Sequence, residues 1–264
     1  MNVEELLCEI SISDLMKLIN EGLTAASQSE TFPKYKRACL LKISENYLMA
    51  VSTDGKRLIV AKSPCEQIKS DEEIVLSAST VKELEKTLAS RYSGENVKIF
   101  VDNSTVRFQL ENDEFQIDRL GITFPKYERV LNDTVHTSMK INSRELITLL
   151  DKINIIAALN KPAHVMVMTL NPKNNEATIS ARHSDYGAVY ETFNAEIKHN
   201  YLQVGFNINY FLDGLKAAGN NSIVIEFSGE SEQARIMREN DNSFLYLLMP
   251  VRLIAADILN ENEK

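Results

Sequence analysis

The stretch SDLMKLI, Ser13 to Ile19, has a counterpart in RELITLL, Arg144 to Leu150, which begins 131 positions later. In both stretches the apolar residues recur at the three- and four-residue spacing of an amphipathic helix. Ser13 stands where the N-cap of the first helix is expected, because a serine side chain can bond the free N–H groups of a first turn. The pair predicts that the same helix occurs early in each half of the chain.

A second pair of segments matches at almost the same offset. SASTVKELEKTLA, which starts at Ser77, falls on GFNINYFLDGLKA, which starts 128 positions later at Gly205. Helical patterns that recur in order at nearly one offset indicate an internal repeat. The sequence therefore predicts two similar domains, residues 1–131 and 132–264.

Alternating apolar and polar runs, which are typical of strands, accompany the helices in both halves. One such run, Tyr47–Ala61, is interrupted by Asp54-Gly55, a dipeptide that strongly favours a hairpin turn. Asn112-Asp113 interrupts another. The second half adds runs at 165–170, 177–181, 223–227, 234–237 and 244–249. The order helix, strands, helix, strands predicts an α+β fold with two helices on one face of antiparallel sheets in each domain.

Composition and charge narrow the range of functions. The chain has 264 residues, is 44% hydrophobic and has a net charge of −8, which suits two globular cores and argues against an overall affinity for nucleic acid. A local basic surface is still compatible with these values. Three cysteines without metal-ligand or redox spacing, an acidic N-terminus and the lack of a membrane-length apolar run predict a cytoplasmic protein.

Catalytic signals are weak, and we predict no catalytic residue, metal or cofactor. The four histidines are scattered, and no glycine-rich phosphate loop is present. His183-Ser184-Asp185 offers two metal ligands, but a turn at the end of a strand is the favoured interpretation. An enzyme whose active-site residues meet only in the fold remains a third alternative, behind the two binding functions described below.

Four segments, in this order, resemble motifs of the bacterial sliding clamp, the beta subunit of the replicative DNA polymerase III. They are STDGKRLIV at 52–60, ITFPKYERVL at 122–131, VGFNINYFLDGLKA at 204–217 and YLLMPVRL at 246–253. The matching family motifs are T-D-G-H-R-L, F-P-D-Y-x-R-V-L, G-F-N-x-x-Y-x-x-D-x-L and M-P-x-R-L. The resemblance covers nearly the whole chain and implies the DNA-clamp fold and a non-catalytic role.

The resemblance is limited to the family's second and third domains. Family chains have three similar domains, and two chains form a ring of six domains around DNA, so the same ring would need three copies of this chain. Closed cyclic symmetry makes a homotrimer an attractive hypothesis. The alternative is a degenerate clamp that does not encircle DNA and acts as an adaptor for clamp-binding proteins or competes for them.

The resemblance also implies a groove in which short peptides of polymerases, the clamp loader and repair proteins dock. The matching positions are Thr53, Gly55, Arg57, Leu58, Pro125, Arg129, Val130, Leu247, Leu248, Met249, Pro250, Val251, Arg252 and Leu253. Apolar walls with polar groups at the rim suit peptide binding, although the same apolar residues could simply seal two domains together. Lys56 replaces the usual histidine of the family, and Lys36 replaces an apolar residue, so the peptide specificity is expected to differ.

Basic residues are expected on the surface that faces DNA in the family. They are Lys34, Lys36 and Arg37, with Tyr35 among them, in a loop after the first helix, and Lys82, Lys86, Lys152 and Lys216 on helices. Lysine and arginine next to an aromatic ring suit phosphate contact and stacking, whereas a solvated charged loop is the simpler interpretation. Contact with duplex DNA should be independent of sequence and strongly salt-sensitive.

The chain continues beyond the last family motif as IAADILNENEK, Ile254 to Lys264. Ile254, Ile258 and Leu259 recur at helical spacing and predict a short amphipathic segment. Two interpretations remain open. The segment covers the groove or docks on a neighbouring molecule, or it is a frayed polar terminus.

Overall fold

The computed structural model describes residues 4–44, 46–67, 72–91, 95–131 and 134–259 and shows two compact units, Met1–Tyr127 and Glu128–Lys264. The sequence-based boundary followed Leu131, four residues later. The intervening residues lie with the second unit because the carbonyl of Val130 accepts a hydrogen bond from Gln233 Nε2 at 2.7 Å.

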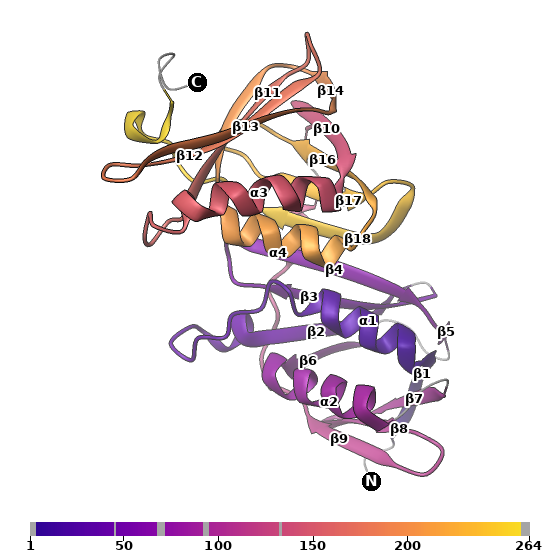
Figure 1. The fold of residues 1–264 in the computed structure, drawn as a ribbon. Coiled ribbons are helices and arrows are strands. Elements are labelled where there is room, and N and C mark those ends of the chain that lie inside the picture. Colours follow the sequence, from indigo (N-terminus) through magenta and orange to yellow (C-terminus); the bar gives the residue numbers. More distant parts are fainter. Residues whose placement is uncertain (1–3, 45, 68–71, 92–94, 132–133, 260–264) are drawn as a thin grey trace. The chain divides into compact units, whose positions relative to one another are not determined.

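The N-terminal unit contains two groups of antiparallel strands and two long helices (Figure 1). Its elements are β1 Glu5–Ser11, α1 Ile12–Gly22, the short 3-10 helix η1 Lys34–Arg37, β2 Ala38–Ser44, β3 Tyr47–Thr53, β4 Arg57–Pro64, β5 Glu66–Gln67, β6 Glu73–Ser77, α2 Ala78–Arg91, β7 Asn96–Val101, β8 Thr105–Gln109 and β9 Glu114–Asp118. The strands lie in the orders β5-β1-β7-β8-β9 and β4-β3-β2-β6. Helix α1 packs against α2 and against β3 and β4.

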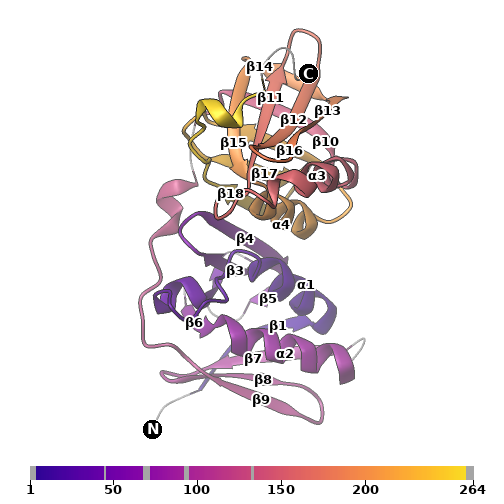
Figure 2. The same cartoon turned by 60° about the vertical axis from the view of Figure 1, so that its left-hand side comes forward.

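The C-terminal unit repeats this plan (Figures 1 and 2). Its elements are β10 Thr137–Asn142, α3 Ser143–Ala157, β11 Val165–Asn171, β12 Glu176–His183, β13 Gly187–Asn194, β14 Glu196–His199, β15 Leu202–Asn207, α4 Ile208–Ala218, β16 Ser222–Phe227, β17 Ala234–Arg238, β18 Asp241–Leu248 and the 3-10 helix η3 Ala255–Asp257. The strands lie in the orders β14-β10-β16-β17-β18 and β13-β12-β11-β15. The predicted α+β class, with two helices on antiparallel sheets in each half, is confirmed.

Buried apolar residues of the strands and of the inner faces of the helices form each core. In α3 these residues are Leu146, Leu150, Ile153 and Ala157. The helical spacing of the sequence predicts Ile147, Leu150, Ile153 and Ala157 for this face. The last three are buried, but Leu146 takes the place of Ile147, which is only partly buried. Among the described residues, no helix is both long and apolar enough to cross a membrane.

The N-cap of the first helix is Ser11, and the sequence-based choice of Ser13 was wrong. The Oγ atom of Ser11 accepts a hydrogen bond from the backbone N–H of Asp14 at 3.1 Å and donates to the Asp14 carboxylate at 2.7 Å. Ser13 lies inside the first turn, with its hydroxyl 3.0 Å from that of Ser11. Strand β1 thus passes directly into α1, and its last residue caps the helix.

The two serines give a direct test of this assignment. Ser11→Ala should lower the free energy of unfolding by about 1 kcal/mol, because a first-turn N–H loses its partner. Ser13→Ala should change it by less than about 0.5 kcal/mol, as is usual for an exposed position without such a role. Urea unfolding followed by circular dichroism measures both. Equal losses in the two variants would contradict the assignment of the cap.

Candidate functional site

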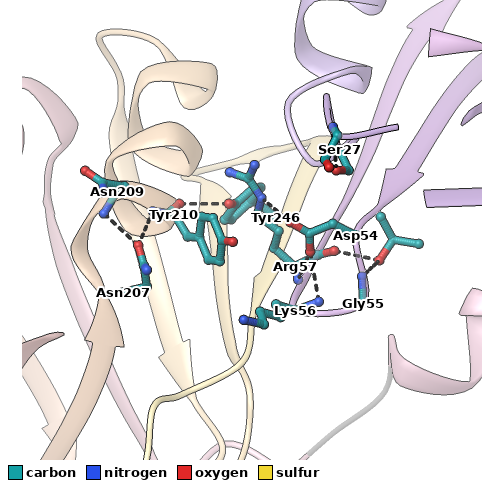
Figure 3. Close-up of polar contacts among 11 residues, drawn as sticks. Ser27, Asp54, Gly55, Lys56, Arg57, Asn207, Asn209, Tyr210 and Tyr246 are labelled. Atoms are coloured by element: carbon teal, nitrogen blue, oxygen red, sulfur yellow. Dashed lines mark hydrogen bonds and ion pairs between the residues drawn. The ribbon is translucent and has the colours of Figure 1, made fainter. Parts of the chain in front are cut away.

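The turn between β3 and β4 is held by its own polar groups (Figure 3). Asp54 Oδ1 accepts from the backbone N–H groups of Lys56 at 2.9 Å and Arg57 at 3.1 Å, and Asp54 Oδ2 accepts from Arg57 Nε at 3.0 Å. Thr53 Oγ1 donates to the Arg57 carbonyl at 2.6 Å and accepts from the N–H of Gly55 at 3.0 Å. Gly55 adopts a φ of +87°, which a side chain would disfavour. The turn therefore has one fixed shape.

Burial differs among the candidate groove positions of the N-terminal unit. Leu58 is buried, and the Arg57 side chain is only 10% exposed beside Asp54. Pro125 is exposed, and the segment around it is anchored by Phe124, whose ring meets that of Tyr127 edge-on at 6.4 Å. The guanidinium group of Arg57 therefore lies inside the turn beside Asp54. The sequence analysis expected the polar groups of the peptide groove at its rim.

In the C-terminal unit, two apolar candidate residues are brought to the same end of the sheet. Ala234 in β17 pairs with Leu248 in β18, so Gln233 and Met249 continue this register at the ends of the two strands. The side chain of Gln233 also donates a hydrogen bond to the carbonyl of Val130. Val130 and Met249 are 45% and 46% exposed. This end of the unit therefore presents an exposed apolar pair, which we call the Val130–Met249 pair.

The other candidate residues of this unit divide into core and surface positions. Leu247 and Leu248 belong to the core, and Arg129 and Arg252 are exposed. Pro250, Val251 and Leu253 are partly buried. The buried leucines hold β18 in place, so the exposed side chains of the last motif are those of Met249 and Arg252.

Gly205 in β15 allows the last motif to lie close against the unit. The N–H of Val251 donates to the Gly205 carbonyl at 2.8 Å, and the two residues form an antiparallel bridge. A Cβ atom at position 205 would lie 2.8 Å from the Val251 carbonyl oxygen and 2.5 Å from Leu253 Cδ2. Only glycine fits beneath this segment. The sequence analysis used Gly205 as part of a motif and did not identify this contact.

The rest of the same motif orients α4 (Figure 3). Asn207 Oδ1 accepts from the N–H groups of Asn209 at 3.0 Å and Tyr210 at 3.1 Å, which makes Asn207 the N-cap of the helix. The hydroxyl of Tyr246 in β18 donates to the Tyr210 carbonyl at 2.8 Å. These contacts fix the position of α4 against β18. The role of these residues is therefore structural rather than ligand binding.

The basic residues Lys34–Arg37, expected in a loop, form the 3-10 helix η1, and their side chains are not all presented in the same way. The Lys36 ammonium lies 5.2 Å from the centre of the Phe32 ring, and a Cβ at Gly55 would lie 2.9 Å from its Nζ atom. Lys36 is therefore packed beside the β3–β4 turn. Lys34 is exposed, and Tyr35 and Arg37 are partly buried.

The helical lysines also fall into two groups. Lys82 donates to Asn20 Oδ1 at 2.7 Å and pairs with Glu85 at 3.2 Å, and Lys152 pairs with Glu191 at 2.9 Å. In the described part of the chain, Lys86 and Lys216 are exposed and form no ion pair. These two lysines are therefore the helical cations that a phosphate could reach without breaking another contact.

The segment His183–Asp185 lies in the turn that joins β12 to β13. The N–H of Asp185 donates to His183 Nδ1 at 3.1 Å, and the His183 ring lies 5.0 Å from that of Tyr186. Within the described ranges, no group of three or more potential metal-ligating side chains is assembled. One of the two ring nitrogens of His183, Nδ1, is thus engaged by the backbone.

The described part of the C-terminal extension folds back onto its own unit. η3 contacts β11 and β12, the N–H of Ile254 donates to Asp257 Oδ2 at 2.9 Å, and Leu259 is buried. Met249 stays 46% exposed, so Ile254–Leu259 does not cover it. Residues 260–264 of the predicted amphipathic segment lie outside the described residues.

Comparison with known proteins gives one consistent result. The family descriptions "DNA polymerase III beta subunit, central domain" and "DNA polymerase III beta subunit, C-terminal domain" match residues 9–126 and 128–252. The chain is 27% identical to the beta sliding clamp of Synechocystis sp. over 252 residues, covering 89% of this chain and 64% of that protein. For the beta sliding clamp of Staphylococcus epidermidis the identity is 26% over 245 residues, and the coverage is 92% and 63%.

Solved structures agree with the sequence matches. The DNA polymerase sliding clamp of Bacillus subtilis superposes with a TM-score of 0.88 at 25% identity, covering 96% of this chain and 66% of that one. The beta subunit of Thermotoga maritima gives a TM-score of 0.86 at 23% identity, covering 95% and 66%. The predicted clamp fold is therefore confirmed. The chain spans about 64% of the length of the curated relatives it matches.

Proposed function

Since the chain belongs to the DNA polymerase III beta subunit family, of which it carries the central and C-terminal domains, we propose that it acts as a clamp-like processivity factor. In this role it tethers polymerase and repair partners to duplex DNA through a peptide-binding groove. The family consists of non-catalytic subunits, which agrees with the expectation that the chain is not an enzyme. A role in DNA replication places the protein in the cytoplasm.

The observation that carries the proposal is the exposed Val130–Met249 pair of the C-terminal unit. Apolar side chains that are about half exposed gain contact area when an apolar side chain of a peptide packs on them. Met249 can adapt its shape to different peptides, because its side chain is unbranched and flexible. For the N-terminal unit, the family resemblance implies peptide contacts at Thr53, Gly55, Leu58 and Pro125, and we propose that role for these residues.

Contact with DNA in this proposal comes from a few exposed cations on an acidic body. Lys34, Lys86 and Lys216 are exposed, and the net charge of the chain is −8. A small number of phosphate contacts gives weak binding that falls steeply with salt and does not depend on sequence. Weak contact of this kind allows a ring to slide along the duplex.

A second candidate function follows from the match to two of the family's domains. The chain spans about 64% of a curated relative and matches the central and C-terminal domains of the family. A chain with two domains closes a six-domain ring only as a trimer. Without that assembly, the protein acts as an adaptor for clamp-binding proteins or as their competitor.

The solution mass separates the two functions. If the chain forms the proposed ring, light scattering at micromolar concentration should give about three times the chain mass of 29.8 kDa. The trimer should then stay on nicked circular plasmid after loading and slide off the same plasmid once it is linearised. A monomer that persists at low salt would overturn encirclement and leave the adaptor function.

A further inference from the structure

The structure brings together two of the three cysteines, although 56 residues separate them in the sequence. Cys8 lies in β1, and Cys65 is the single residue between β4 and β5. Strand β5 pairs with β1 antiparallel, with Cys8 opposite Gln67 and Glu9 opposite Glu66. Cys65 is two positions from Gln67, so its side chain points to the same face as that of Cys8.

The two thiols meet at the edge of the core of the N-terminal unit. Cys8 is fully buried within the apolar cluster, and Cys65 packs against the same cluster from a partly buried position. The backbone N–H of Cys65 donates to the carbonyl of Asn46 at 3.0 Å, which fixes the position of this residue after β4. Both thiols therefore belong to one packed region, where Cys65, next to β5, lies diagonally across from Cys8 in β1.

The environment gives the two sulfurs different roles. A hydrogen bond with Cys65, together with burial, raises the pKa of Cys8. The same hydrogen bond stabilises the thiolate of Cys65 and lowers the pKa of that thiol. Because the thiolate is the reactive form, Cys65 is the sulfur that attacks an oxidant first. Cys8 is the sulfur that then attacks the oxidised Cys65.

Solvent reaches only one member of the pair. An open cavity of about 520 Å³ is lined by Cys65 together with residues such as Ser11, Asn46 and Asn96, and Cys8 does not line it. A small oxidant in this cavity meets Cys65 directly.

The third cysteine is a natural control within the same unit. Cys39 in β2 is fully buried, and burial raises the pKa of its thiol to about 12. Among the described residues, no second cysteine lies beside it. Its Sγ atom donates a hydrogen bond to the Leu40 carbonyl oxygen at 3.9 Å. Cys39 should therefore remain a thiol under conditions that oxidise Cys65.

We propose that Cys65 and Cys8 are a peroxide-sensitive modification site that closes to a disulfide between β1 and the segment after β4. The Cys65 thiolate attacks one oxygen of hydrogen peroxide, the O–O bond breaks, and a sulfenic acid forms. The hydroxide that leaves takes up the proton lost by the Cys65 thiol and becomes the first water. Cys8 sulfur then attacks the Cys65 sulfur, the S–S bond forms, and the S–O bond breaks to release a second water with the proton from Cys8. Two thiols and one peroxide give one disulfide and two waters, so two electrons pass from sulfur to peroxide.

The disulfide closes a long loop that includes β2, β3 and β4. Restricting so long a loop in the unfolded chain stabilises the folded unit, so its Tm should rise by about 5 °C or more after oxidation. Dithiothreitol should reverse the shift. This inference does not depend on whether the protein encircles DNA or binds partner peptides.

The test uses the full chain treated with hydrogen peroxide, with thiols counted in denaturant and cross-links mapped by mass spectrometry of a non-reduced digest. The wild type should fall from three thiols to one and yield a peptide that links Cys8 to Cys65. Cys8→Ala should stop at a sulfenic acid on Cys65 that dimedone traps. Cys65→Ser should keep both remaining thiols at the same dose, and Cys39→Ala should form the Cys8–Cys65 link normally.

Several results would overturn the proposal. One is retention of all three thiols at a dose that fully oxidises free glutathione under the same conditions. Others are oxidation of Cys39 before Cys65, or cross-links between chains in place of the link within one chain. If Cys8→Ala folds poorly, Cys8→Ser serves as the second variant, and trapping of its Cys65 sulfenic acid decides the result.

Discussion

Gly205→Ala is expected to weaken binding of a clamp-binding peptide at least tenfold and to lower the free energy of unfolding by about 2 to 3 kcal/mol. The added methyl group would lie 2.5 Å from Leu253 Cδ2 and 2.8 Å from the Val251 carbonyl oxygen. One of these contacts involves backbone, which cannot rotate away. The segment after β18 must therefore move, and the bridge between Val251 and Gly205 is lost.

The effect on binding follows from what this segment carries. Met249 and Arg252 flank the bridge and are both exposed, so a displaced segment misplaces the proposed ligand contacts. A fluorescent peptide taken from a polymerase's clamp-binding region, titrated by anisotropy, measures the affinity. Urea unfolding of the same variant measures the stability.

Gly229→Ala is the matched control in the same unit. A Cβ atom at that position lies 3.4 Å from the flexible Glu232 side chain, which is an ordinary contact. Peptide affinity and stability should both change little. Wild-type affinity in a folded Gly205→Ala protein would show that the last segment does not shape the binding site.

Arg238→Met should lower the free energy of unfolding by about 3 kcal/mol, the largest loss we expect from a single charged residue. Arg238 is buried and donates to the last carbonyls of α4, to Ala218 at 2.8 Å through Nε and to Ala217 at 3.2 Å through Nη2. Its guanidinium carbon also lies 4.6 Å from the centre of the Phe244 ring. Methionine fills similar volume but removes the guanidinium donors to the carbonyls of Ala217 and Ala218 and the positive charge that is buried at this helix end.

The measurement is the urea midpoint, compared with Arg144→Met as the control. Arg144 is an exposed residue in the first turn of α3, and its replacement should change stability by less than about 0.5 kcal/mol. If Arg238→Met lowers the free energy of unfolding no more than this control does, the contacts of Arg238 with α4 contribute little to stability. A loss in both variants would point to a general effect of removing positive charge.

The architecture could be predicted because its signals are local or repeated. Helical periodicity at one offset revealed the duplicated plan, and Asp54-Gly55 marked a hairpin from two adjacent residues. The cap of α1 could not be read in the same way. Ser11 and Ser13 are both suitable serines, and the choice depends on where β1 ends.

The parts of the candidate site that escaped sequence analysis depend on long-range contacts. Cys8 and Cys65 have no redox spacing, because the pairing of β1 with β5 brings them together. Lys36 lies beside Gly55 only because the loop before β2 packs on the β3–β4 turn. Val130 joins the C-terminal unit through Gln233, a contact that no local pattern encodes.

The self-contained bonding of the Thr53–Arg57 turn has a consequence for how quickly a ligand is bound. Asp54 and Thr53 already satisfy the backbone groups of the turn, so a ligand that meets it causes no loss of conformational entropy there. Association with such a surface is governed by diffusion and orientation, and it varies little among related ligands. Differences in affinity between peptides that use this turn should therefore be found in their residence times.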